Sequence, residues 1–127
     1  MDEPMDAPWE DSEVRSSNDD VPETYVVAGT WPNAVLRENA PVSAHYGQAL
    51  ARRLAYVIAV SETSLRALGE RAGVSHTTIS RLLAGRVLVD IGTVARLEAA
   101  LGTEIWPGLS ALEPRGSSAE AGEGAGT

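Results

Sequence analysis

A very short linker in the middle of the chain is the feature that most restricts how this sequence can fold. It joins two segments with helical patterns. Residues 64–72 and 75–84 each carry apolar side chains at helical spacing, and only the tripeptide GVS joins the two patterns. So short a joint makes the helices cross steeply, which requires small residues where their backbones meet. Gly69 meets this requirement, Gly73 suits the end of the first helix, and Ser75 suits the cap of the second. The pattern therefore predicts two short helices held at a fixed angle.

Two further helical patterns flank this pair. The first follows Pro41 with Ser43 as its expected cap, and its apolar stripe is Tyr46, Leu50, Leu54, Val57 and Ile58. The second begins at the expected cap Asp90 and ends at Gly102, with the stripe Ile91, Val94, Leu97 and Leu101. Trp106, in EIWPG, is expected to pack back onto the domain. The helical patterns together predict an all-α, compact four- to five-helix bundle. Because the chain has no Phe, its core should consist mainly of Leu, Val, Ile and Ala.

Acidic residues are concentrated at the N-terminus. The chain has a formal net charge of −8, and residues 1–24 hold nine of its 18 acids against Arg15 alone, so this segment accounts for the whole −8. Its composition predicts a disordered acidic arm. By contrast, residues 41–108 hold seven arginines against five acids, a net charge of +2. The acidity of the chain is therefore that of its arm.

The remaining composition suggests where the other parts of the chain begin and end. We expect a connector over residues 25–41 with a possible short strand in TYVVAGTW (24–31), and a helical domain over 42–108. Residues 109–127, rich in Gly, Ser and Ala, are expected to form a flexible tail. The longest apolar run, LAYVIAV, is far shorter than the roughly 20 residues of a membrane span, so we expect no contact with a membrane.

The stretch SLRALGERAGVSHTTISRLLAGR, followed by DIGTVARLEAALGTEIWP, resembles the Cro/Xre family of phage-repressor-like helix-turn-helix domains. The resemblance covers roughly residues 44–107. It implies a bundle whose second and third helices form the reading unit, with the third in the major groove of double-stranded DNA. It also implies a homodimer that reads two half-sites about one helical turn apart. The link VLVD (87–90) departs from the polar, Pro-containing link of the family.

The inward positions of the third helix indicate which of its side chains would face DNA. With Val74, Ile79 and Leu82 inward, the outward side chains are His76, Thr77, Ser80 and Arg81, which match base-reading positions of the family. A bidentate contact from Arg81 to guanine would contribute about 1–3 kcal/mol of discrimination. Phosphate contacts are expected from Ser64, Ser75, Arg86, Arg66, Arg52 and Arg53. The simpler alternative is that these polar side chains are merely solvated.

Catalytic and metal chemistry find little support in the sequence. The chain has no Cys, and its two histidines, His45 and His76, do not form an H-x-x-x-H pair. No Ser lies in a G-x-S-x-G turn, and AGEGAGT lacks the Lys and the following helix of a phosphate-binding loop. We therefore expect no enzymatic activity, no metal site and no cofactor.

Together these features predict a sequence-specific DNA-binding transcriptional regulator, a dimeric repressor in the cytoplasm that associates with the nucleoid. The alternative is a protein-interaction module or antitoxin-like adaptor that binds a protein partner through the acidic arm or residues 24–31. Trp9 is either without a role in the arm or the anchor of such a partner-binding segment. The arm is further predicted to compete with DNA phosphates for the arginines of the domain. This competition would lower the affinity for DNA and increase its dependence on DNA sequence.

Overall fold

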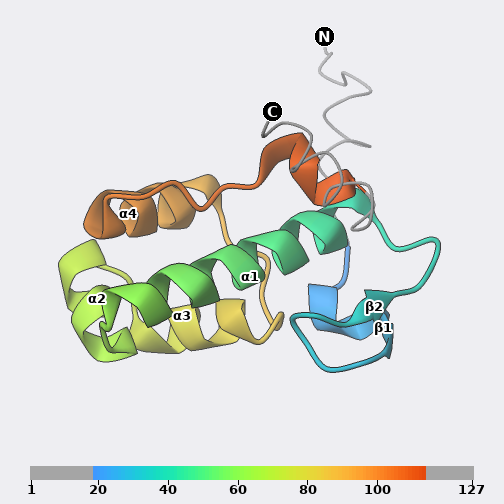
Figure 1. Ribbon diagram of the computed structural model, residues 1–127, viewed down its shortest axis with the longest axis horizontal. Coiled ribbons are helices and arrows are strands. Elements are labelled where there is room, and N and C mark those ends of the chain that lie inside the picture. The colour runs from blue at the N-terminus through green and yellow to red at the C-terminus, as the bar shows by residue number, and fades with distance from the viewer. Residues whose placement is uncertain (1–18, 114–127) are drawn as a thin grey trace, which may run out of the picture.

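The computed structural model describes residues 19–113, so the expectations for residues 1–18 and 114–127 lie outside the described part. Four α-helices make up most of it: α1 Val42–Ser61, α2 Leu65–Ala72, α3 His76–Leu83 and α4 Ile91–Leu101. In Figure 1, α1 crosses the molecule, with α4 on one side of it and α3 on the other, and α2 lies at the end where α1 finishes, in contact with both α3 and α4. The expected four-helix, mainly helical fold is confirmed. No helix within residues 19–113 has the length and apolarity needed to cross a membrane.

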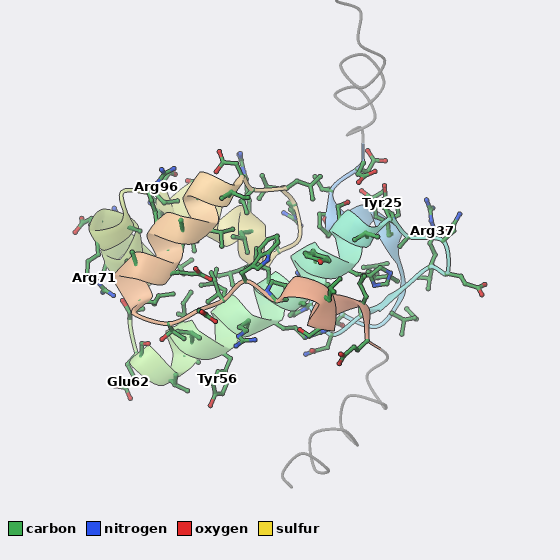
Figure 2. All side chains as sticks on the ribbon, turned by 90° about the horizontal axis from the view of Figure 1, so that it is seen from above. Tyr25, Arg37, Tyr56, Glu62, Arg71 and Arg96 are labelled. Atoms are coloured by element: carbon green, nitrogen blue, oxygen red, sulfur yellow. The ribbon has the colours of Figure 1, made fainter. Side chains whose placement is uncertain are left out.

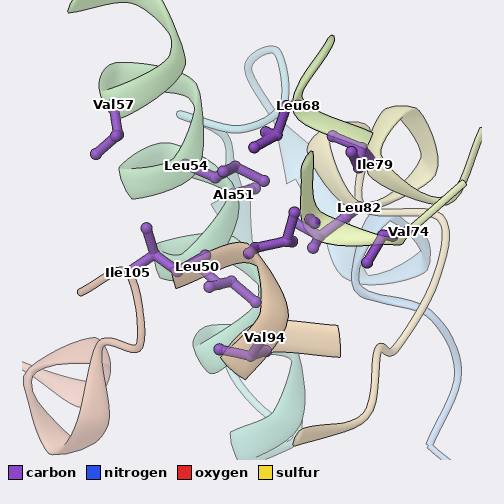
Figure 3. Packing of buried hydrophobic residues seen from close by; sticks show 12 residues of the cluster. Leu50, Ala51, Leu54, Val57, Leu68, Val74, Ile79, Leu82, Val94 and Ile105 are labelled. Carbon is purple, nitrogen blue, oxygen red and sulfur yellow. The ribbon is translucent and has the colours of Figure 1, made fainter. Parts of the chain in front are cut away.

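The core lies where the four helices meet (Figure 3). Its fully buried large side chains include Leu54 of α1, Leu68 of α2, Ile79 of α3 and Leu97 of α4. Each such side chain contributes about 1.5–3 kcal/mol when it leaves water. The inward positions expected for Val74, Ile79 and Leu82 are confirmed, since all three belong to the core cluster.

Two expectations about the ends of the helices were wrong. Ser43 does not cap α1: Pro41 is the N-cap residue without a side-chain cap, and the Ser43 hydroxyl donates to the Asp19 carboxylate at 2.7 Å. Ile91 does not join the core, because it is the first residue of α4 and its side chain is 76% exposed. Ile105, which the helical pattern did not include, is fully buried instead.

The residues before α1 are folded against the helices. A 3₁₀ helix, η3 (Pro22–Tyr25), is followed by strand β1 (Val26–Ala28), which pairs antiparallel with β2 (Val35–Leu36). β1 lies within the segment 24–31, where the sequence predicts a strand. The guanidinium of Arg37 lies over the Tyr25 ring, 4.8 Å from its centroid (Figure 2). This small hairpin lies beside the first turns of α1 (Figure 1).

The folded part of the chain extends further in both directions than the composition predicts. Pro22 is buried beside Gly47, where an added Cβ would lie 2.6 Å from the proline ring. Residues 19–24 thus belong to the fold rather than to a disordered arm, because Pro22 and Tyr25 both have places in the packing. A second 3₁₀ helix, η4 (Gly108–Leu112), contacts α1, so residues 109–112 do not belong to a flexible tail.

Candidate nucleic-acid interface

The α2–α3 unit is built around Gly69. A Cβ at this position would lie only 2.6 Å from the Val74 carbonyl oxygen and 3.3 Å from the His76 backbone nitrogen. The Gly69 carbonyl accepts hydrogen bonds from the N–H groups of Gly73 and Val74, at 2.8 and 3.0 Å. Gly73 has φ 72°, in the left-handed region that ends helices. The close crossing expected from the GVS joint is therefore a direct contact of two backbones.

A serine begins each helix of this unit. The Ser64 hydroxyl oxygen accepts from the Ala67 N–H at 3.0 Å. The Ser75 hydroxyl oxygen accepts from the N–H groups of Thr77 and Thr78, at 3.1 and 3.4 Å. In both caps the oxygen is the acceptor, so the hydroxyl proton can still be donated to a phosphate.

The exposed face of α3 holds all four side chains expected to read bases. Ile79 and Leu82 are buried beneath the helix, and His76, Thr77, Ser80 and Arg81 are exposed. No ion pair among residues 19–113 includes Arg81. One solvent-facing side of the helix thus carries the Arg81 guanidinium, the Thr77 methyl group, the His76 imidazole and the Ser80 hydroxyl.

The six expected phosphate contacts do not form a single group. Arg66 lines a shallow hollow together with Ser75 and His76, between α2 and the start of α3. Arg52 and Arg53 line another hollow, whose lining includes no residue of α2 or α3. The former group therefore lies beside the exposed face of α3, whereas the α1 arginines are set apart from it. Phosphate contact by Arg52 and Arg53 stays a prediction.

Residues 62–105 match a family model described as helix-turn-helix. This segment is similar to helix-turn-helix domains. The match contains α2, α3 and α4 and agrees with the Cro/Xre resemblance, and the family is one of DNA-binding domains. No curated protein and no solved structure matches the chain.

Residues that precede the matched segment hold the end of α3. The Trp31 indole N–H donates to the Leu83 carbonyl at 2.9 Å, which satisfies one of the free carbonyls in the last turn of α3. Gly85 follows that turn with φ 72°, and a Cβ there would lie 2.6 Å from two atoms of the indole ring. Trp31 therefore packs directly against the end of α3. The only sequence signal for this contact was the presence of a glycine at position 85.

Arg86, at the same end of α3, already has a partner within the chain. Its Nε lies 3.2 Å from Oε1 of Glu23, and both side chains are exposed. The Glu23 N–H also donates to the Gly85 carbonyl at 2.9 Å. Arg86 therefore differs from Arg81 and Arg66, because a phosphate would have to replace a carboxylate. The sequence places Glu23 in the arm and did not predict this pair.

A buried amide fixes the hairpin to α1. The Gln48 Nε2 group donates to the carbonyls of Pro32 and Ala34, at 2.9 and 2.7 Å. Gln48 is the one buried polar side chain of the described residues, and these two bonds satisfy both of its N–H donors. Trp31 is thus held between an anchored turn and the end of α3. Sequence patterning missed Gln48 because a single polar residue on an apolar stripe carries no positional signal.

Carboxylates fix α4 at both of its ends. The Asp90 carboxylate accepts from the Thr93 N–H at 2.8 Å, and this hydrogen bond to the backbone lowers the pKa of Asp90 below its ordinary value. The Glu98 carboxylate accepts from the N–H groups of Ile105 and Trp106, at 2.8 and 2.9 Å. These bonds return the chain to the core after α4. Trp106 packs against Tyr46, with ring centroids 5.2 Å apart.

Proposed function

We propose that this chain is a sequence-specific transcriptional regulator, a repressor, that reads the major groove of DNA with the exposed face of α3. The observation that carries the proposal is the exposed row of His76, Thr77, Ser80 and Arg81 on a helix whose other face is buried. An exposed helix face can enter the major groove, where each base pair presents a distinct pattern of donors and acceptors. The helix-turn-helix match over α2–α4 supports this reading.

The chemistry of each side chain suggests its role. The Arg81 guanidinium, which has no ion pair with any of residues 19–113, suits the O6 and N7 acceptors of guanine, and the Thr77 methyl group suits the methyl group of thymine. His76 can donate to a base or a phosphate. Ser75 and Arg66 line one hollow beside the start of α3 and would bind a phosphate of the DNA backbone there.

The electrostatic balance supports a dimer. A net charge of +2 over residues 41–108 provides few cations for phosphate contacts. Since each neutralised phosphate adds to affinity through the release of counterions, one copy would bind weakly. Two copies on adjacent half-sites would double the number of contacts.

The direct test is the substitution Arg81→Ala, measured by fluorescence anisotropy on DNA selected by the unchanged chain and on shuffled DNA. We expect the ratio of the two affinities to fall by about 5- to 150-fold, the equivalent of about 1–3 kcal/mol, with unchanged thermal stability because Arg81 is exposed. Arg53→Ala is the matched control for this ratio, since Arg53 lies in a hollow without residues of α3 and the loss of a phosphate contact there would lower both affinities alike. An unchanged ratio in Arg81→Ala would contradict the proposal.

A protein-binding role is the second candidate, and exposed valines on the hairpin favour it. Val27 of β1 and Val35 of β2 are 61% and 58% exposed. Exposed apolar side chains on a short two-stranded sheet can contribute to contacts with other proteins. Under this alternative Arg81→Ala leaves partner binding intact and Val27→Glu abolishes it.

A further inference from the structure

An apolar groove lies between the first half of α1 and the link from α3 to α4. It has a volume of about 300 Å³, and every side chain that lines it is uncharged. Val42 and Tyr46 of α1 lie on one side of it, and Leu88 and Trp106 line it from the link and from the segment after α4. Val42, Leu88 and Trp106 are 56%, 42% and 47% exposed, respectively. Large apolar side chains gathered around a hollow indicate a site for an apolar group.

The N-terminal segment enters the described part of the chain at the rim of this groove. The Asp19 carboxylate accepts from the hydroxyl of Ser43, at 2.7 Å, and Ser43 lines the groove. Pro22, which follows shortly in η3, lines it as well. Residues 1–18 are therefore tethered directly beside the groove, and tethering gives an attached group an effective concentration in the millimolar range.

The tethered segment carries one aromatic side chain, Trp9, among acids that the uncharged groove would not accept. Trp9 precedes Asp19 by ten residues. Ten residues span at most about 33–36 Å when extended, which is ample to return to the rim. Trp9 can therefore reach the groove while Glu10 and Asp11 stay in water.

The groove offers the surroundings that an indole ring favours. The rings of Tyr46 and Trp106 meet at its wall with an interplanar angle of 57°. Aromatic rings prefer such tilted contacts, and a tryptophan buries about 150–250 Å² of surface when it is enclosed. The indole ring of Trp9 could add a third aromatic contact to the pair of Tyr46 and Trp106. Met5 and Val14, the other apolar candidates nearby in the segment, lack this match.

We propose that the side chain of Trp9 occupies this groove, so that the acidic N-terminal segment docks onto its own domain. The docked segment is held by an apolar contact, whereas its carboxylates remain solvated. This docking does not depend on DNA binding, because the groove is lined by Leu82 from the buried face of α3 and by none of its exposed side chains.

The test is ¹⁹F NMR of the full chain labelled with 5-fluorotryptophan. Three tryptophans give three resonances, and Trp9→Tyr identifies the one that belongs to Trp9. We expect the Trp9 resonance to be shifted from its position in urea and to respond less to replacement of H₂O by D₂O than it does in urea. The shift should be the same at all protein concentrations, because the contact lies within one chain.

Two matched variants locate the contact. Val42→Glu places a charge at the groove and should return the Trp9 resonance to its urea position, whereas Val27→Glu, on the exposed hairpin, should leave it unchanged. Thermal melting checks that both variants stay folded, as expected for two exposed valines. A Trp9 resonance that coincides with its urea position, or one that responds equally to both variants, would overturn the proposal. A concentration-dependent shift would also overturn it, in favour of a second copy in the groove.

Discussion

Glu23 and Arg86 form a pair that no local pattern in the sequence indicates. Arg86 was expected to contact phosphate and Glu23 to belong to a disordered arm, but the fold joins their side chains across 63 positions of the chain. The caps Ser64, Ser75 and Asp90 could be predicted, because a cap depends on a side chain and the few residues that follow it. The predicted cap at Ser43 was wrong, because its hydroxyl donates to the distant Asp19 instead. Local roles are thus readable from the sequence only where no distant partner competes for the side chain.

Removing the carboxylate of Glu23 should free Arg86 for DNA. We expect Glu23→Gln to bind DNA more tightly and to add about −0.9 to the slope of log affinity against log salt, the contribution of one further phosphate. The exposed pair contributes at most about 1 kcal/mol to stability, so the melting temperature should change little. Titrations at several salt concentrations measure both quantities. Glu38→Gln removes an equal charge that forms no ion pair within the described part of the chain, and equal effects of the two variants would refute this role of the pair.

Asp90 makes the stability of α4 depend on pH. Its pKa is lower in the folded chain than in the unfolded one, so the unfolded chain binds more protons at acidic pH. The stabilisation is complete above the ordinary aspartate pKa of about 4 and is lost as the pH falls through the lower, folded-state value. We expect Asp90→Ala to lower the melting temperature at neutral pH and to have a smaller effect at strongly acidic pH. Melting curves of both chains across this range measure the difference, and a pH-independent difference would contradict it.

Among the elements, the α2–α3 unit was predictable and the hairpin only in part. Gly69, Gly73 and Ser75 determine the angle between α2 and α3 within a few residues of each other. The place of the hairpin depends instead on Gln48 and on the contact between Trp31 and the end of α3, which lie far along the chain. β2 is only two residues long, too short for an alternating pattern to be recognised.

The close approach of α2 and α3 can be tested with two glycines that both lie inside helices. Gly69→Ala places a Cβ 2.6 Å from a backbone oxygen, which cannot move without separating the helices. We expect it to lower the free energy of unfolding by more than 1 kcal/mol, as overpacking does, and to weaken DNA binding. Gly92→Ala meets only side-chain atoms, the flexible Arg96 guanidinium at 3.4 Å and Oδ1 of Asp90 at 3.6 Å, so it should be neutral or up to about 1 kcal/mol stabilising. Denaturant unfolding of both variants measures this, and similar losses would argue against the backbone contact.

For the whole molecule, the question is how a chain with a net charge of −8 approaches a polyanion. Residues 1–18 hold six acids and one arginine, so a chain that starts at Asp19 would have a net charge of −3. We choose Asp19 as the first residue of a shortened chain because Pro22 and Tyr25 are buried, and removal of residues 1–24 would damage the fold. The sequence predicted the unequal charge distribution, but only the packing of Pro22 shows that residues 19–24 belong to the fold.

Deletion of residues 1–18 should tighten DNA binding at low salt. The deleted carboxylates compete with phosphates for the arginines of the domain, and salt screens this competition beyond about 10 Å at 0.1 M. We therefore expect a difference between the shortened and the full chain that decreases as salt increases. Titrations of the two chains on one DNA duplex measure the difference. Equal affinities at low salt would rule out the competition.

The central claim is that the exposed face of α3 reads a DNA sequence, and selection from a random-sequence DNA pool by the full chain tests it most directly. We predict that the bound pool is enriched in a recurrent motif of two half-sites about one helical turn apart. The same selection with Arg81→Ala should keep the spacing and lose the preference for guanine at one position of each half-site. A bound pool without any enriched motif, or a motif unchanged by Arg81→Ala, would contradict the account.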